Sequence, residues 1–133
     1  MTRKERYEKV LAYFRQEMPE VTTELDYGST FQLLVAVILS AQCTDKRINQ
    51  VTPALFRDYP TAYDLANAED YEIFEYIKTV SYPNAKAKHL VAMAKMLVSN
   101  HGGDVPCDMN QLIELPGVGR KTANVMKAVA FGQ

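Results

Sequence analysis

The amino-acid sequence predicts an all-α domain of about eight helices joined by short loops. Apolar residues recur every three or four positions in successive segments, and a capping residue or a glycine bounds most of these segments. No segment alternates apolar and polar residues as a half-buried strand does, and no Asn-Gly pair marks a hairpin. The chain has 133 residues, of which 47% are hydrophobic, and this is enough for one domain with its own core.

Capping sequences mark the first two predicted helices. Thr2-x-x-Glu5 is a capping box, and it begins a helix that Pro19 ends. Ser29-x-x-Gln32 begins the second helix, in which residues 31–39 are apolar on nearly every side, so we expect this helix to lie buried at the centre. The inward stripe of the first helix comprises Tyr7, Val10, Leu11, Phe14 and Met18.

Three further helices follow in the middle of the chain. Thr44 or Asp45 begins the first of these, and Pro53 is expected to kink it. Thr61-x-x-Asp64 begins a short helix. Asn67-x-x-Asp70 begins another, which is expected to bury Tyr71, Phe74 and Ile77.

The C-terminal part of the sequence predicts one long helix and two short ones. The long helix follows Ser81-Tyr82-Pro83-Asn84, and Gly102-Gly103 stops it. Asp108-x-x-Gln111 caps a short helix that ends at Leu115, and after a glycine-rich turn the last helix runs to about Phe131.

Composition excludes several classes of protein. The longest apolar stretch, Leu33 to Leu39, is far shorter than the ~20 residues that span a bilayer, and no N-terminal signal segment is present. Cys43 and Cys107 have no histidine at metal-ligand spacing, so we expect reduced thiols in a cytoplasmic protein and no metal site.

Charge is unevenly distributed along the chain. Up to Glu75 there are 8 basic and 13 acidic residues, whereas from Tyr76 onward there are 7 basic and 3 acidic. This asymmetry permits a face for a polyanion, although a solvated helix surface gives the same count.

The turn from Leu115 to Lys121, with the sequence Leu-Pro-Gly-Val-Gly-Arg-Lys, is the most informative segment. Gly117 and Gly119 allow the backbone to bend and to come close to a ligand. We expect the N–H groups of Val118, Gly119 and the next helix turn to point outward and form an anion site. From spacing alone, an ordinary packing corner between two helices explains the turn equally well.

Extended to Leu115-Pro-Gly-Val-Gly-Arg-Lys-Thr-Ala-Asn124, this turn resembles the helix–hairpin–helix signature of the endonuclease III family of base-excision DNA glycosylases. Thr22-Thr-Glu-Leu25, Ser40-Ala-Gln-Cys-Thr-Asp45 and Asn84-Ala-Lys-Ala-Lys88 agree with it, in the family's order. The resemblance implies a six-helix barrel domain at residues 21–133, with the helix–hairpin–helix at about 109–131. It also implies that the helix at residues 1–20 belongs to a second domain.

The same resemblance implies an enzyme that removes oxidised pyrimidines from double-stranded DNA and cleaves the strand at the abasic site. The damaged base is flipped into a pocket because its sugar is inaccessible inside the stack. Lys121 matches the nucleophile, which attacks C1′ and forms a Schiff base. A lysine suits this role only when its amine is neutral, and a positive helix start beside Arg120 favours the neutral form. Without the motif, such a lysine would be read as a solvated surface charge.

Other residues match the family's DNA contacts. Gln42 matches the residue that fills the gap left by the flipped base, where an amide can satisfy the orphaned partner base; outside the motif it would be a polar helix end. Tyr82 aligns with the wedge, although Ser81-Tyr82-Pro83 departs from the family's usual residues. Ser40 and Asp45 lie near the implied lesion pocket. We expect Asp45 to cap the third helix rather than to contact the lesion.

Two family features fall beyond Gln133. These are the catalytic Asp of a Val-Asp-Thr-His segment and the four cysteines that hold a 4Fe-4S cluster. The sequence therefore predicts the first part of a longer bacterial enzyme, cytoplasmic and associated with the nucleoid. An uncovered apolar stripe on the N-terminal helix predicts self-association.

The sequence is also compatible with two other functions. One is a non-catalytic helix–hairpin–helix DNA-binding module. The other is a part of an enzyme that folds but binds nothing tightly, because half of the groove is absent.

Overall fold

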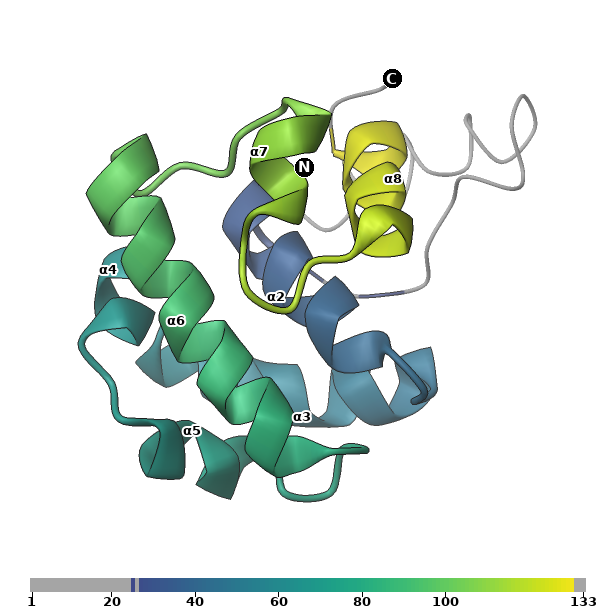
Figure 1. Cartoon of the computed structure of the whole chain (residues 1–133). Coiled ribbons are helices and arrows are strands. Elements are labelled where there is room, and N and C mark those ends of the chain that lie inside the picture. The colour runs from purple at the N-terminus through teal and green to yellow at the C-terminus, as the bar shows by residue number, and fades with distance from the viewer. Residues whose placement is uncertain (1–24, 26, 131–133) are drawn as a thin grey trace, which may run out of the picture.

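The computed structural model describes Leu25 and residues 27–130, which form an all-helical unit (Figure 1). The predicted all-α fold is confirmed for these residues. The predicted N-terminal helix, its apolar stripe and the self-association expected from it lie outside them, as does the predicted end of the last helix at Phe131. The helices are α2 (Thr30–Ser40), α3 (Asp45–Asp58), α4 (Ala62–Ala66), α5 (Asp70–Ile77), α6 (Pro83–His101), α7 (Met109–Ile113) and α8 (Arg120–Val129).

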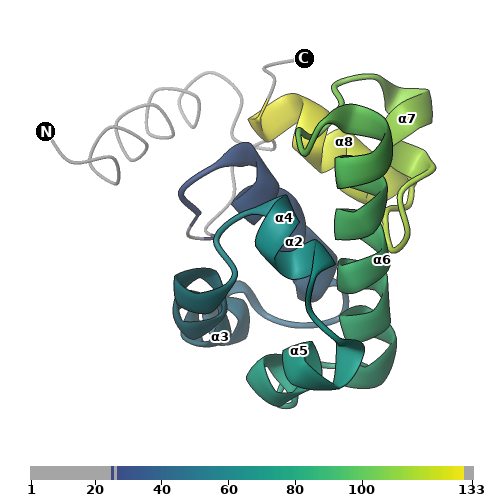
Figure 2. The same ribbon diagram turned by 90° about the vertical axis from the view of Figure 1, so that its left-hand side faces the viewer.

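Helix α2 lies at the centre of the core, as its apolar sequence predicts. Every residue from Leu33 to Leu39 is buried. Helices α3, α6 and α8 all contact α2, and Figures 1 and 2 show it in the middle of these helices. Each fully buried leucine stabilises the fold by about 1.5–3 kcal/mol through burial alone, so α2 organises the packing of its neighbours.

Side-chain caps begin four helices where the sequence predicts them. The hydroxyl groups of Ser29, Thr44 and Thr61 and the carboxylate of Asp108 each accept a hydrogen bond from the backbone N–H three residues further on, at 3.1–3.3 Å. The expectation that Asp45 caps the third helix is wrong, because Thr44 does so. Asp45 is instead the first residue of α3, where the positive end of the helix dipole stabilises its carboxylate.

Helix α5 begins later than predicted, and one of the three residues predicted to be buried is exposed. Glu69, rather than Asn67, precedes its first residue and forms a capping box with Glu72. Asn67 instead ends α4. Ile77 is buried as predicted and Phe74 packs, partly buried, against the core. Ile73, which the sequence did not single out, is also buried, whereas Tyr71, predicted to be buried, is 68% exposed.

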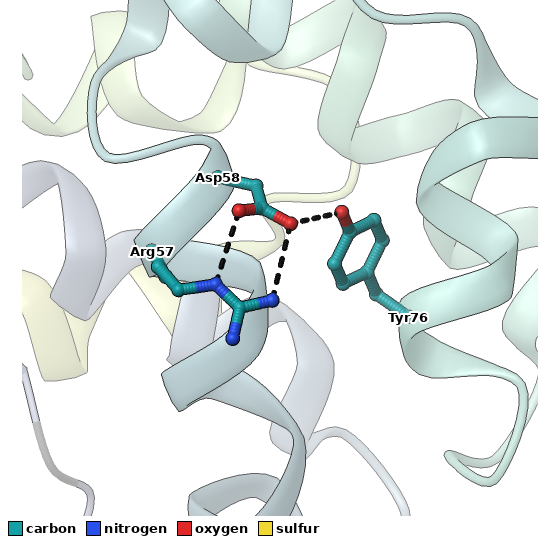
Figure 3. Close-up of polar contacts among 3 residues, drawn as sticks. All are labelled: Arg57, Asp58 and Tyr76. Atoms are coloured by element: carbon teal, nitrogen blue, oxygen red, sulfur yellow. Dashed lines mark hydrogen bonds and ion pairs between the residues drawn. The ribbon is translucent and has the colours of Figure 1, made fainter.

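A polar contact joins α3 to α5 on the surface (Figure 3). The carboxylate of Asp58 accepts hydrogen bonds from the guanidinium of Arg57, at 3.1 Å from Nε, and from the hydroxyl of Tyr76. The Arg57 bond, followed by the Tyr76 bond, lowers the pKa of the Asp58 carboxyl below its ordinary value. The ring of Tyr76 also packs edge-on against Tyr59, with centroids 5.6 Å apart.

The long helix α6 ends as the sequence predicts. Gly102 and Gly103 both have positive φ, and the N–H of Gly103 donates to the carbonyl of Leu97 at 2.8 Å. The short α7 and the turn after it then lead into α8, which packs against both α7 and α2. This arrangement places the start of α8 near the C-terminal end of α2.

We predict that Leu34→Ala lowers the free energy of unfolding by about 2–5 kcal/mol, because it leaves a cavity in the fully buried centre. Tyr71→Ala is the matched control and should change it by only about 0.5 kcal/mol, since this side chain is exposed. Urea unfolding followed by far-UV circular dichroism measures both. A comparable loss in the two variants would contradict the corrected orientation of α5.

Candidate active site

A cavity of about 330 Å³ opens between the C-terminal end of α2, the start of α3 and the first turns of α8. Four residues that the sequence singled out line it: Ser40, Gln42, Asp45 and Lys121. The first three lie close together in sequence, whereas Lys121 joins them through the packing of α8 on α2. The remaining lining residues, which sequence reasoning did not select, are Leu25, Val37, Ala41, Thr122 and Val125.

Lys121 is the second residue of α8, and its side chain is exposed. The helix begins after Gly119, which has no side chain to cap the first-turn N–H groups. Those groups therefore leave a positive helix end beside the amine. The half-buried carboxylate of Asp45 lines the same cavity from α3. The site thus places a primary amine and a carboxylate on a shared, solvent-connected cavity.

Gln42 lies in the loop between α2 and α3 and adopts an unusual backbone conformation. Its φ is +57°, in the left-handed region that side chains other than glycine rarely occupy. The side chain is exposed, while its carbonyl accepts a 2.7 Å hydrogen bond from the hydroxyl of Ser81. The adjacent N–H of Cys43 donates to the carbonyl of Ser40 at 3.0 Å and closes the turn. This loop projects Gln42 into solvent at the rim of the cavity.

Tyr82 also has a positive φ, +52°, and its side chain is 65% exposed. Gln42 and Tyr82 are the two non-glycine residues with positive φ in the described part of the chain. Tyr82 does not line the cavity, but it directly follows Ser81, which is bonded to Gln42. Pro83 begins α6, a position that suits its fixed φ and its missing N–H. Strained residues of this kind are held by their surroundings and cluster at functional sites.

The glycine-rich turn combines a packing corner with an open face. A Cβ on Gly117, which has φ +80°, would lie 2.9 Å from Cβ of His89, so this glycine is required by close packing on α6. A Cβ on Gly119 would meet nothing within 4 Å. Gly119, Arg120 and Lys121 are exposed. The open face therefore begins at Gly119.

The expectation that the N–H of Val118 is free to bind an anion is wrong. It donates to the carbonyl of Leu115 at 3.1 Å, because the turn closes on itself with an i to i+3 bond. The side chain of Val118 is buried and holds the turn against the core. Anion binding at this turn must rely on Gly119 and the first turn of α8.

Sequence reasoning missed Lys86, although a signal was present. Lys86 lies four residues before Leu90 on the buried stripe of α6, and it is only 6% exposed. Its ammonium donates to the carbonyl of Leu39 at 2.8 Å and to that of Ala41 at 2.6 Å. Burial lowers the pKa of the Lys86 amine below its ordinary value. A lysine at an apolar position of a helical repeat indicates a paired, buried charge.

Comparison with known families identifies the class of protein that this fold and cavity define. Residues 35–132 match the HhH-GPD superfamily of base excision DNA repair proteins, and the chain belongs to this superfamily. The chain is 47% identical to endonuclease III of Synechocystis sp. over 98% of its own length, and 41% identical to endonuclease III of Escherichia coli over 93%. It spans about 60% of the length of these relatives.

Solved structures agree with the family assignment. This chain superposes on the structure of a trapped covalent intermediate of endonuclease III with DNA, with a TM-score of 0.82 and 39% sequence identity. The superposition covers 99% of this chain and 62% of the endonuclease III chain. A non-covalent endonuclease III–DNA complex gives the same values. A thermostable thymine-DNA glycosylase, at 24% identity and a TM-score of 0.75, shares the fold.

Two kinds of feature are absent from the described residues. Among Leu25 and residues 27–130, no three His, Cys, Asp or Glu side chains come together as a possible metal site. No helix within this part of the chain is long and apolar enough to cross a membrane.

We predict that the two glycines of the turn differ in how much they contribute to stability. Gly117→Ala should lower the free energy of unfolding by about 1–3 kcal/mol, because the new Cβ collides with His89 at a backbone angle that favours glycine. Gly119→Ala should change it by about 1 kcal/mol or less, since the space is open. Thermal unfolding of both variants is the measurement. If Gly119→Ala were the more destabilising, the assignment of the packed and open halves of the turn would be contradicted.

Proposed function

We propose that this chain carries the DNA-binding surface and the nucleophile of an endonuclease III-type enzyme, a DNA glycosylase for oxidised pyrimidines that is also an abasic-site lyase. The observation that carries the proposal is the cavity that brings Lys121, Gln42, Ser40 and Asp45 together. Membership in a base excision repair superfamily supports it. The proposed substrate is double-stranded DNA containing a damaged pyrimidine or an abasic site.

In the proposed reaction, Lys121 is the nucleophile. Nζ forms a bond to C1′ of the damaged nucleotide while the glycosidic bond breaks, and the bond's electron pair leaves with the base. The amine loses its proton, the sugar ring opens, and a Schiff base remains. This makes the proton on C2′ acidic; its loss expels the 3′ phosphate and cleaves the strand. Lys121 is suited to this reaction because it is exposed on the cavity at a positive helix start.

We assign the other residues to DNA contacts. Gln42 enters the gap left by the flipped nucleotide, since its amide offers both a donor and an acceptor to the partner base. Tyr82 is the wedge beside it. Gly119 and Arg120 contact phosphate at the open start of α8, while Gly117 and Val118 hold the turn in shape. Ser40 and Asp45 line the pocket that receives the lesion.

The 4Fe-4S cluster implied by the family resemblance does not fit the described residues, which offer no cluster of suitable ligands. We propose that its cysteines lie beyond Gln133, together with the catalytic Asp. The proposed setting is the nucleoid in a bacterial cytoplasm.

A non-catalytic DNA-binding module is the second candidate function. The exposed start of α8, with Gly119, Arg120 and Lys121, can bind phosphate whether or not a base is excised. The two functions differ in whether a covalent adduct forms with an abasic site.

For this chain we predict slow formation of a borohydride-trapped adduct with abasic DNA and little release of an oxidised base. An abasic site offers an open-chain aldehyde that Lys121 attacks directly, whereas base release requires the charge stabilisation that the family's Asp supplies. Lys121→Ala should abolish trapping without loss of helical content. Lys95→Ala, an exposed lysine of α6, controls for the lost charge and should trap as wild type does. Trapping that persists in Lys121→Ala would assign the nucleophile elsewhere.

DNA binding should be weak and should fall steeply with salt. Each neutralised phosphate contributes about −0.9 to the log–log slope of affinity against salt. Gly119→Ala should weaken binding to any sequence, because the added methyl group obstructs the backbone approach to phosphate. Fluorescence anisotropy at several salt concentrations measures both effects. Binding that does not depend on salt, or unchanged affinity in a folded Gly119→Ala variant, would contradict phosphate binding by this turn and leave it only a role in helix packing.

A further inference from the structure

The C-terminal end of α2 is held by a charge from a distant helix. The last turn of α2 contains no basic residue of its own. Lys86, at the start of α6, places its ammonium 2.8 Å from the carbonyl oxygen of Leu39 and 2.6 Å from that of Ala41. These carbonyls lie at the end of the helix, where intrahelical donors run out and the helix dipole is negative. A buried cation is therefore well matched to this position.

A second bond ties the same two segments together. The hydroxyl of Ser81 donates to the carbonyl of Gln42 at 2.7 Å. Three hydrogen bonds thus connect the end of α2 and the loop after it to the segment that begins α6. They lie on either side of the two residues with strained backbones, Gln42 and Tyr82. Helix α6 also packs against α2, as Figure 2 shows. A shift of one loop must therefore move the other or break these bonds.

We infer that Lys86 is a positioning residue which, with Ser81, locks the Gln42 loop to the Tyr82 loop so that the two side chains enter the duplex as one rigid pair. The inference rests on the proposed function, in which Gln42 fills the gap left by the flipped nucleotide and Tyr82 is the wedge beside it. Pre-ordering both loops removes a cost that the protein would otherwise meet on binding. Loss of the lock should consequently reduce recognition of the damaged site more than binding to DNA in general.

A purely structural role predicts a different result. If Lys86 only capped α2, its loss would lower stability and would weaken binding to damaged and undamaged DNA by the same factor. The ratio of the two dissociation constants is therefore the informative quantity. We would measure it with a duplex that carries a tetrahydrofuran abasic analogue, which cannot form a Schiff base, and with the matching undamaged duplex.

The test compares Lys86→Met with Lys88→Met in this chain. Both variants lose one positive charge from the first turns of α6, but Lys88 is exposed, and its side chain makes no hydrogen bond or ion pair within the described part of the chain. We expect Lys86→Met to reduce discrimination for the abasic duplex about tenfold, equivalent to ~1.4 kcal/mol. Its affinity for undamaged DNA should equal that of Lys88→Met. Ser81→Ala, with Ser99→Ala as its exposed control, should reduce discrimination in the same direction by a smaller factor.

A measurement without DNA tests the lock itself. The N–H of Cys43 closes the Gln42 turn, so its hydrogen exchange should be faster in Lys86→Met than in Lys88→Met. Hydrogen exchange should be unchanged at Ala123, whose N–H donates to the carbonyl of Gly119 at the start of α8. If Lys86→Met does not fold, both the ratio of dissociation constants and the hydrogen exchange at Cys43 are measured on Ser81→Ala instead.

The outcomes separate this inference from the proposed function. Unchanged discrimination in Lys86→Met and Ser81→Ala, or equal loss on both duplexes, would overturn the positioning role and leave the function standing. A wild-type chain that binds the abasic and undamaged duplexes equally would contradict the proposed lesion recognition, and the positioning role would fall with it.

Discussion

Helix α2 has no polar face, and this constraint organises the described structure. Because residues 33–39 are buried on all sides, neighbouring helices must surround α2, and α3, α6 and α8 do so. The helix must nevertheless end, and its last carbonyls then lack intrahelical donors, although the first of them, that of Leu39, is buried. Lys86 supplies them from α6. The same requirement that completes the core therefore fixes the loop that carries Gln42, at the rim of the cavity.

The cavity is a consequence of how three helix ends meet. The C-terminal end of α2, the first residue of α3 and the first turn of α8 supply Ser40, Asp45 and Lys121 respectively. Helix α8 reaches this place because Gly117 allows the preceding turn to pack closely against His89, while Gly119 leaves its outer face open. One half of the turn thus serves packing and the other half exposes the start of α8 to a ligand.

Much of the fold could be predicted from the sequence, because its signals are local. Caps such as Ser29 and Thr61, the glycines after α6 and the unbroken apolar run of α2 each act within a few residues. The start of α5 differs from the prediction because Asn67 is a common N-cap residue, whereas Glu69, which precedes α5, is not of a type that sequence patterns favour at this position. The site residues were suggested by a resemblance. Lys86 stands at an apolar position of a helical repeat, which indicates a buried charge, but only tertiary packing brings it to its partners, the carbonyls of Leu39 and Ala41. The bond from Val118 to Leu115 is local, but the spacing of the glycines does not determine whether that N–H is free.

We propose above all that Lys121 and the cavity it lines form a covalent site for damaged DNA. The most direct measurement identifies the residue to which the sugar of abasic DNA becomes bonded. The wild-type chain is reacted with abasic DNA, the Schiff base is reduced with borohydride, and the product is digested. Tandem mass spectrometry then sequences the cross-linked peptide. We expect the reduced sugar to be attached to Nζ of Lys121. Attachment to another amine, such as Lys127 or the N-terminus of Met1, would contradict it.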